Sequence, residues 1–215
     1  MARAELCDAA AQHAARRTGV PLPVMQAITR VETGRARGRG LEPWPWTVNM
    51  EGKGYWFETR AEAEAFVARA VKQGARSFDI GCFQINHRWH GAAFRSPAEM
   101  FDPHSNAAYA ARFLRELHEE SGNWSIAAGW FHSRTPARAQ TYQARFERVR
   151  AALEAGPAPA TAALPRKGPS GGDPAPNSFP LLAGGASGAA PGSLVGLARP
   201  VRGPLLPALF AARGS

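Results

Sequence analysis

The chain has 215 residues, a formal net charge of +9 and 45% hydrophobic residues. That length fits one ordinary domain with a tail, or two small domains. A charge this basic is typical of proteins that bind nucleic acid, an anionic membrane surface or an acidic polymer such as cell wall, and charge alone does not choose among them. No stretch approaches the length of a membrane span, so we expect none.

Composition divides the chain unevenly. From Gly156 onward it holds 11 of the 18 prolines and 11 of the 22 glycines. Such a stretch cannot bury enough apolar surface to offset its ordering entropy. We therefore predict a folded domain over residues 3–154 and a disordered tail over 155–215. Apolar residues return between prolines at 193–197 and 205–210, which predicts either a short partner-docking segment or a passive tail.

The predicted elements of the domain are mainly helical. Pro23 suits a first helical turn, Gly19 and Gly74 are natural stops, and Thr59 with Glu62 forms a capping box. Residues 34–58 are expected to form a long irregular loop, and residues 77–86 an extended segment or tight turn. The fold class is thus mainly α with at most a short β element. We expect helices at residues 3–18, 21–32, 59–73, 102–120, 124–132 and 135–153.

Glu32 is the first candidate for chemistry. It ends an amphipathic helical stretch, where the negative end of the helix dipole disfavours a second negative charge. Partial burial would raise its pKa further and make it a general acid near neutral pH. The alternative is a solvated residue at a helix end.

The two cysteines, Cys7 and Cys82, lack neighbours at metal-ligand spacing, so we expect no metal site and no cofactor. They are either two buried thiols or one disulfide, and a disulfide implies an oxidising compartment. The N-terminus lacks the apolar core of a signal peptide. The chain is therefore expected to be cytoplasmic, exported by another route, or preceded by an upstream start.

Three segments hold the unusual polar residues: 31–33, 79–86 and 127–133. Together with the tryptophans of residues 44–56 they indicate a cleft with one acid, several amides and aromatic platforms, a set that suits sugars. Each piece also has a plainer interpretation. The tryptophans would be core residues, Gln84 and Asn86 would satisfy buried backbone, and the histidines would lie at the surface or cap helices.

These segments resemble the lytic transglycosylase family, which has the goose-type lysozyme-like fold. Glu32-Thr33 stands where that family has Glu-Ser at a helix end, Gly81-Cys-Phe-Gln84 where it has Gly-Leu-Met-Gln, and Trp130-Phe-His132 where it has Ala-Tyr-Asn. Residues 43–49 and 82–86 are similar to a bacterial branch of the family. The resemblance covers roughly residues 5–150.

The resemblance implies cleavage of the β-1,4 bond between N-acetylmuramic acid and N-acetylglucosamine in peptidoglycan, with 1,6-anhydromuramyl products and no water consumed. Glu32 would act first as acid and then as base. It also implies a periplasmic protein whose partners are glycan strands, with a flagellar or secretion machine as a possible partner of the tail. The residues expected to bind substrate are Thr33, Trp46, Asn49, Tyr55, Gln84, Asn86, Phe131 and His132.

Two departures from the family pattern matter. Phe131 replaces a tyrosine whose hydroxyl would lie near the acid, which weakens the case for full activity or moves that role to Tyr55 or His132. Cys82 replaces a leucine, which favours a disulfide with Cys7 in an exported protein.

Three alternatives stay open. A hydrolytic lysozyme of the same fold would use Asp79 to hold a water, although Asp79 could equally cap a turn. A non-catalytic wall-binding or assembly protein would keep the cleft without turnover. A nucleic-acid binder would use the Arg-Gly repeats of residues 34–40, but that segment is short and lies between a helix and a Trp-rich loop, so we expect no nucleic-acid partner.

Overall fold

The structure is a computed structural model that describes residues 3–37 and 40–156. Within them it is mainly helical with a few short strands. The predictions made for residues 157–215, including disorder and partner docking, concern residues outside that range. The helices are α1 (Arg3–Thr18), α2 (Leu22–Thr33), α3 (Arg60–Lys72), α4 (His87–His90), α5 (Pro97–Met100), α6 (Pro103–Ser121), α7 (Trp124–His132) and α8 (Pro136–Ala155), with a 3₁₀ turn at Gly91–Ala93.

Local signals explain where the long helices begin and end. The side chain of Thr59 accepts from the Glu62 N–H and Glu62 reaches back, which completes the predicted capping box of α3. Asp102 caps α6 and Asn123 caps α7 through their side-chain oxygens. Gly122 ends α6 with φ 66°, a left-handed conformation that glycine adopts without strain.

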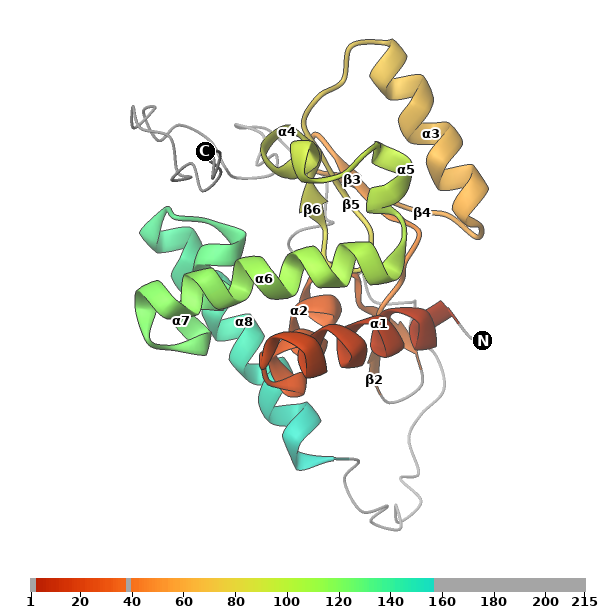
Figure 1. The fold of residues 1–215 in the computed structure, drawn as a ribbon. Coiled ribbons are helices and arrows are strands. Elements are labelled where there is room, and N and C mark those ends of the chain that lie inside the picture. Colours follow the sequence, from red (N-terminus) through yellow and green to blue (C-terminus); the bar gives the residue numbers. More distant parts are fainter. Residues whose placement is uncertain (1–2, 38–39, 157–215) are drawn as a thin grey trace, which may run out of the picture.

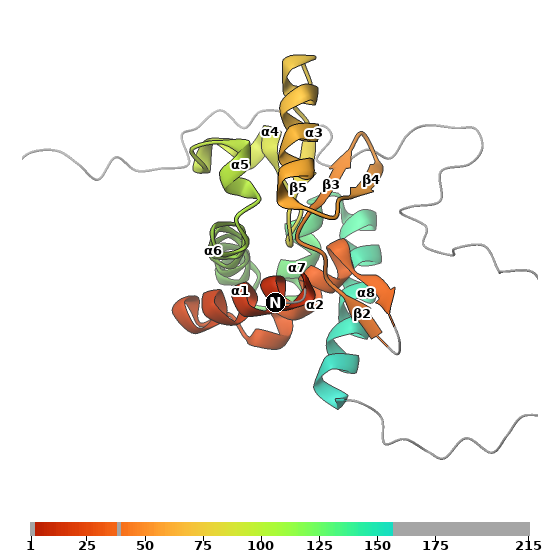
Figure 2. The ribbon, with the colours of Figure 1, turned by 90° about the vertical axis from the view of Figure 1, so that its right-hand side faces the viewer.

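The strands form two small antiparallel sheets. β1 (Arg35–Arg37) pairs with β2 (Gly40–Glu42). The second sheet has the order β4-β3-β5-β6, built from β3 (Thr47–Met50), β4 (Lys53–Trp56), β5 (Phe78–Ile80) and β6 (Ile85–Asn86). Figures 1 and 2 show this sheet between α3 on one side and the body made of α1, α2, α6, α7 and α8 on the other.

The prediction of an irregular loop over residues 34–58 was wrong, because four strands lie there. The β3–β4 hairpin turns at Glu51 and Gly52, whose φ angles are 53° and 83°. Two residues with positive φ form the turn that matches the natural twist of a hairpin. Sequence reasoning missed it because Glu is an uncommon first residue for such a turn, and the expected β content was consequently too small.

One core connects the helical body with the sheet. α2 packs against α1 and α8, while α6 packs against α1 and α7. Fully buried side chains from both parts meet there, among them Ile28, Phe78, Phe83, Leu114 and Phe146. The C-terminal end of α2, which carries Glu32, is thereby fixed between α8 and the hairpins. No helix in the described ranges has the length and apolar character needed to cross a membrane.

Candidate functional site

Glu32 lies in the last turn of α2 and is hydrogen-bonded from α8. The hydroxyl of Tyr142 donates to Glu32 Oε1 over 2.7 Å. The pKa of Glu32 is raised from an ordinary 4.5 to about 7, chiefly because burial penalises the charged carboxylate. The Tyr142 hydrogen bond opposes this shift, Asp79 adds to it by charge repulsion, and Arg145 lowers the pKa. Glu32 can therefore both give and take a proton near neutral pH.

Tyr142 is held rigidly beside this carboxyl group. It is 5% exposed, and the ring of His132 from α7 stacks on it with centroids 4.6 Å apart and planes 11° from parallel. The pKa of His132 is lowered to about 4 by burial, with Arg145 and Arg138 adding to the effect. His132 is therefore a neutral stacking partner at neutral pH.

Sequence reasoning missed Tyr142. It assigned the role of the hydroxyl that Phe131 lacks to Tyr55 or His132. Tyr142 stands three residues after Ala139 and four before Phe146, both buried, so its spacing indicates an ordinary core residue. Tyr55 instead packs on Phe66 of α3, with ring centroids 4.6 Å apart. Phe131 packs against Phe113 of α6, with centroids 5.6 Å apart.

A row of polar residues crosses one face of the four-stranded sheet. Directly opposed residues of an antiparallel pair share a face, and Asn49 faces Asp79 while Asp79 faces Asn86. Trp56 joins the row, since it faces Thr47, two residues from Asn49. The opposite face carries the apolar residues Val48, Ile80 and Ile85, with Tyr55 paired to Val48.

Two predicted substrate residues, Asn49 and Asn86, thus lie in the same row as Asp79. Asp79 is 7% exposed and accepts a hydrogen bond from Asn86 Nδ2 over 2.8 Å. Asn86 also caps α4 by accepting from the Trp89 N–H. Asn49 Oδ1 and Trp56 Nε1 are buried polar atoms with no hydrogen-bond partner among the described residues. In native proteins such atoms nearly always have a hydrogen-bond partner, either in the protein or in ordered water.

The turn between β5 and β6 is fixed by hydrogen bonds to β3 and to α6. Gln84 has φ 46° and its amide donates to the backbone oxygens of Gly81 and Thr47. Asn106 of α6, fully buried, accepts from the Phe83 N–H and donates to the oxygens of Ile80 and Met100. The NH2 group of Gln84 is thus engaged in positioning the turn.

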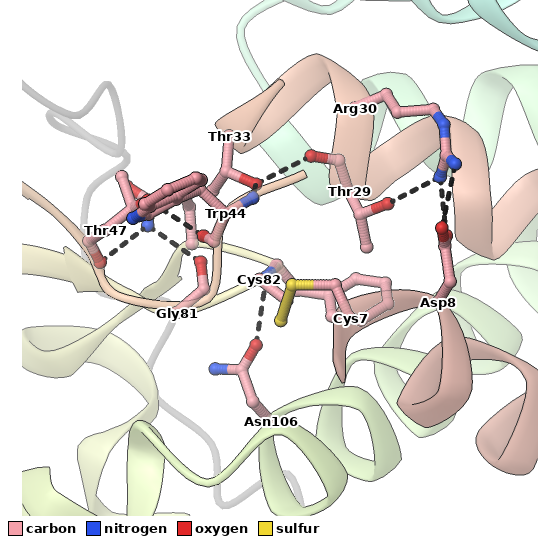
Figure 3. The surroundings of a disulfide bond; sticks show 12 residues. Cys7, Asp8, Thr29, Arg30, Thr33, Trp44, Thr47, Gly81, Cys82 and Asn106 are labelled. Atoms are coloured by element: carbon pink, nitrogen blue, oxygen red, sulfur yellow. Dashed lines mark hydrogen bonds and ion pairs between the residues drawn. A yellow bond between two sulfur atoms is a disulfide. The ribbon is translucent and has the colours of Figure 1, made fainter. Parts of the chain in front are cut away.

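Thr33 and Trp46, two predicted substrate residues, both make contacts within the fold. Thr33 is 1% exposed, and its hydroxyl donates to Thr29 O and accepts from the Trp44 N–H (Figure 3). It therefore ties the end of α2 to the chain entering β3. Trp46 is partly buried and packs against the core.

Cys7 of α1 and Cys82 of the β5–β6 turn form a disulfide, with their Cα atoms 5.7 Å apart (Figure 3). Both residues are buried, and Asn106 approaches the same turn from α6. The disulfide connects the segment that contains Asp79 and Gln84 covalently to the helical body.

An open hollow of about 650 Å³ lies elsewhere, lined by residues of α3, α5 and the start of α6. Its lining includes Arg60, Glu99 and Asp102 and none of the residues around Glu32. In the described part of the chain, no three His, Cys, Asp or Glu side chains gather as the ligands of a metal ion would. The groups that act on the Glu32 carboxyl group are the phenol of Tyr142 and the charges of Asp79 and Arg145.

No protein-family model matches the chain, and no curated protein or solved structure is significantly similar to it.

Proposed function

We propose that the protein is a peptidoglycan lytic transglycosylase with a goose-type lysozyme-like domain, working in the periplasm. The observation that carries the proposal is the partly buried carboxyl group of Glu32, with a pKa of about 7 and a hydrogen bond from Tyr142. One carboxyl group suffices for cleavage when the substrate supplies its own nucleophile, whereas ordinary glycosidases need a pair. The order of the sequence segments around Glu32 supports the same assignment.

In the proposed reaction, Glu32 begins protonated and gives its proton to the glycosidic oxygen, so that the bond to C1 of the muramic acid breaks. The carboxylate then takes the proton of the muramic 6-hydroxyl, whose oxygen attacks C1 and closes the 1,6-anhydro ring. Glu32 ends protonated again. A pKa near neutrality suits both steps, and the Tyr142 hydroxyl stabilises the carboxylate that exists between them.

A hydrolytic lysozyme is the second candidate, and the position of Asp79 favours it. Asp79 lies close enough to Glu32 to raise its pKa, as a second carboxylate in a glycosidase would. Its engagement with Asn86 favours a structural role instead. A third candidate is a non-catalytic wall-binding protein, and the argument for it is that Phe131 lacks the hydroxyl of the family's tyrosine. Because Tyr142 supplies a hydroxyl at Glu32, a phenylalanine at position 131 no longer counts against catalysis.

Mass spectrometry of the fragments released from purified peptidoglycan separates these candidates. Wild-type protein is expected to release anhydromuramyl products and Glu32→Gln none, because Gln keeps the shape of the side chain but cannot shuttle a proton. Products with reducing ends would show that the protein is a hydrolase and not a transglycosylase. Binding of glycan without any product from wild-type protein would leave the wall-binding function.

A further inference from the structure

Trp44 forms a rigid platform surrounded by arginines, and the function proposed above does not use it. Its indole N–H donates to Phe57 O over 2.8 Å, its backbone N–H donates to Thr33 Oγ1, and it is 3% exposed. The guanidinium carbons of Arg3 and Arg35 each lie 4.8 Å from the ring centroid, and that of Arg37 lies 5.6 Å away.

Within residues 3–37 and 40–156, Arg3 is the one member of this group that forms an ion pair. Arg3 forms an ion pair with Glu58 over 2.8 Å. Arg35 and Arg37 are exposed, and no carboxylate of the described residues forms an ion pair with either. They are two residues apart on β1, so both side chains lie on one face of the strand. Glu42 faces Arg35 across the hairpin and is exposed as well.

Stacking prepares these arginines to bind anions. A guanidinium lying over an aromatic ring keeps its N–H groups at the edge, where they match the two oxygens of a carboxylate. Because Trp44 is fixed by its own hydrogen bonds, less side-chain freedom is lost when an anion binds. Arg35 and Arg37 form no ion pair with a described carboxylate, although Glu42 lies opposite Arg35, and they therefore favour a ligand with several carboxylates.

The platform also lies close to Glu32. Arg35 follows it by three residues, so their Cα atoms are at most about 10 Å apart even in a fully extended chain. In peptidoglycan, the muramic acid next to the bond that is cut carries a short peptide with free carboxylates. A sugar placed for proton transfer from Glu32 would bring that peptide within reach of an arginine side chain on β1.

We propose that Arg35 and Arg37, stacked on Trp44, bind the carboxylates of the peptide stems of the glycan strand. This inference rests on the proposed function, because the stems belong to the muramic acid that Glu32 is proposed to act on. The β1–β2 hairpin then distinguishes strands that carry stems from bare strands. The affinity that it adds depends on salt, since exposed charges are screened over about 10 Å.

Binding of the full chain in the inactive Glu32→Gln background tests the proposal without turnover. The ligands are glycan strands of one length, either with stems intact or with stems removed by an amidase, which leaves one lactyl carboxylate on each muramic acid in place of the carboxylates of the stem. The Arg35→Gln/Arg37→Gln variant is expected to bind stem-bearing strands roughly fivefold more weakly and stem-free strands unchanged. Glu42→Gln is expected to bind stem-bearing strands about twofold more tightly, because it removes the opposing charge on the hairpin.

Arg16→Gln/Arg17→Gln is the matched control, since it removes the same charge at exposed positions. These residues lie thirteen or more positions beyond Arg3 along α1, about 20 Å from it along the helix axis. Equal binding of both strands together with no effect of the hairpin variant would overturn the inference and leave the transglycosylase standing. Failure to bind either strand would overturn both. If DNA bound more tightly than stem-bearing strands, and the Arg35→Gln/Arg37→Gln variant weakened that binding, the ligand of these arginines would be nucleic acid instead of a peptide stem.

Discussion

At Glu32, opposing effects on one carboxyl group set its pKa. Burial and Asp79 favour the neutral acid, while the hydrogen bond from Tyr142 and the charge of Arg145 favour the carboxylate. Because burial is the largest effect, the pKa settles near 7 and both forms are populated at neutral pH. Removing a single contributor should therefore move the pH dependence of catalysis in a known direction.

Tyr142→Phe removes the hydroxyl that stabilises the carboxylate of Glu32. The pKa of Glu32 should rise further above 7, so activity that needs the protonated acid should persist to higher pH than in wild-type protein. The maximal rate should fall roughly 10- to 100-fold, because a hydrogen bond to a charged group formed during the reaction is lost. Release of soluble fragments, followed from pH 5 to pH 9, measures both effects.

Tyr55→Phe is the control for that measurement, because it deletes the same hydroxyl from a tyrosine that packs on Phe66. Its pH profile should coincide with that of the wild type. If Tyr142→Phe kept the wild-type rate and profile, Tyr142 would have no part in positioning or stabilising Glu32.

The raised pKa of Glu32 also has a consequence for stability. The folded protein holds this proton more tightly than the unfolded chain, since the pKa is about 7 in one and an ordinary 4.5 in the other. The contribution to the free energy of unfolding is thus greatest below pH 4.5 and is lost as the pH rises through 7. Glu32→Gln should be more stable than wild type at pH 8, by up to about 3 kcal/mol.

Urea unfolding at pH 4 and pH 8 tests this difference. The two proteins should be equally stable at pH 4, because Glu32 is then protonated in both the folded and the unfolded wild-type chain. All other titrating groups are shared, and those that do not interact with Glu32 cancel in the comparison. A wild type at least as stable as Glu32→Gln at pH 8 would contradict the burial of a charged carboxylate.

At the scale of elements, the β5–β6 turn depends on a glycine. Gly81 has φ 82°, and a Cβ added there would lie 2.9 Å from Asn106 Nδ2. Gly122 has a similar φ of 66°, but a Cβ there would meet nothing within 4 Å. Gly81→Ala should destabilise the protein by about 2–4 kcal/mol and reduce cleavage, whereas Gly122→Ala should cost about 1 kcal/mol and leave activity unchanged.

Thermal or urea unfolding of the two glycine variants separates the cost of the backbone conformation from that of the clash. Equal losses for both would show that Asn106 can move aside, and the turn would then be less tightly fixed than its two hydrogen bonds to Asn106 suggest.

The elements that sequence predicted well have local signals, and those that it missed do not. Caps and glycines delimited the long helices, since Thr59, Asp102 and Gly122 act within one turn of the chain. The β3–β4 hairpin had no such signal. The polar row of Asn49, Asp79 and Asn86 depends on strand register, which pairs positions far apart in sequence.

The candidate site shows the same division. Glu32 could be found from its position at the end of an amphipathic helix and from the segments that follow it. Tyr142 contacts it from 110 residues away, and no local pattern around Tyr142 distinguishes it from a core residue. Trp44 likewise acquires its arginines from α1 and β1 only when the fold is formed.

For the whole molecule, the disulfide is the longest-range covalent constraint. Cys7 and Cys82 are 75 residues apart, and their bond closes a loop that includes Glu32 and β1 to β5. Closing a loop of that size removes freedom chiefly from the unfolded chain, an effect of about 4 kcal/mol in the chain-entropy description. The bond also fixes the β5–β6 turn against α1, so both stability and the geometry at Glu32 depend on it.

Replacement of both cysteines by serine should therefore lower the free energy of unfolding by about 3–4 kcal/mol, and it should lower cleavage at temperatures where the variant begins to open. Urea unfolding with and without a thiol reductant provides the comparison. Wild-type protein should lose most of this difference in reductant, while the double variant should not respond, because it has no bond to break. Equal stability of oxidised wild type and variant would mean that packing alone holds the turn on α1.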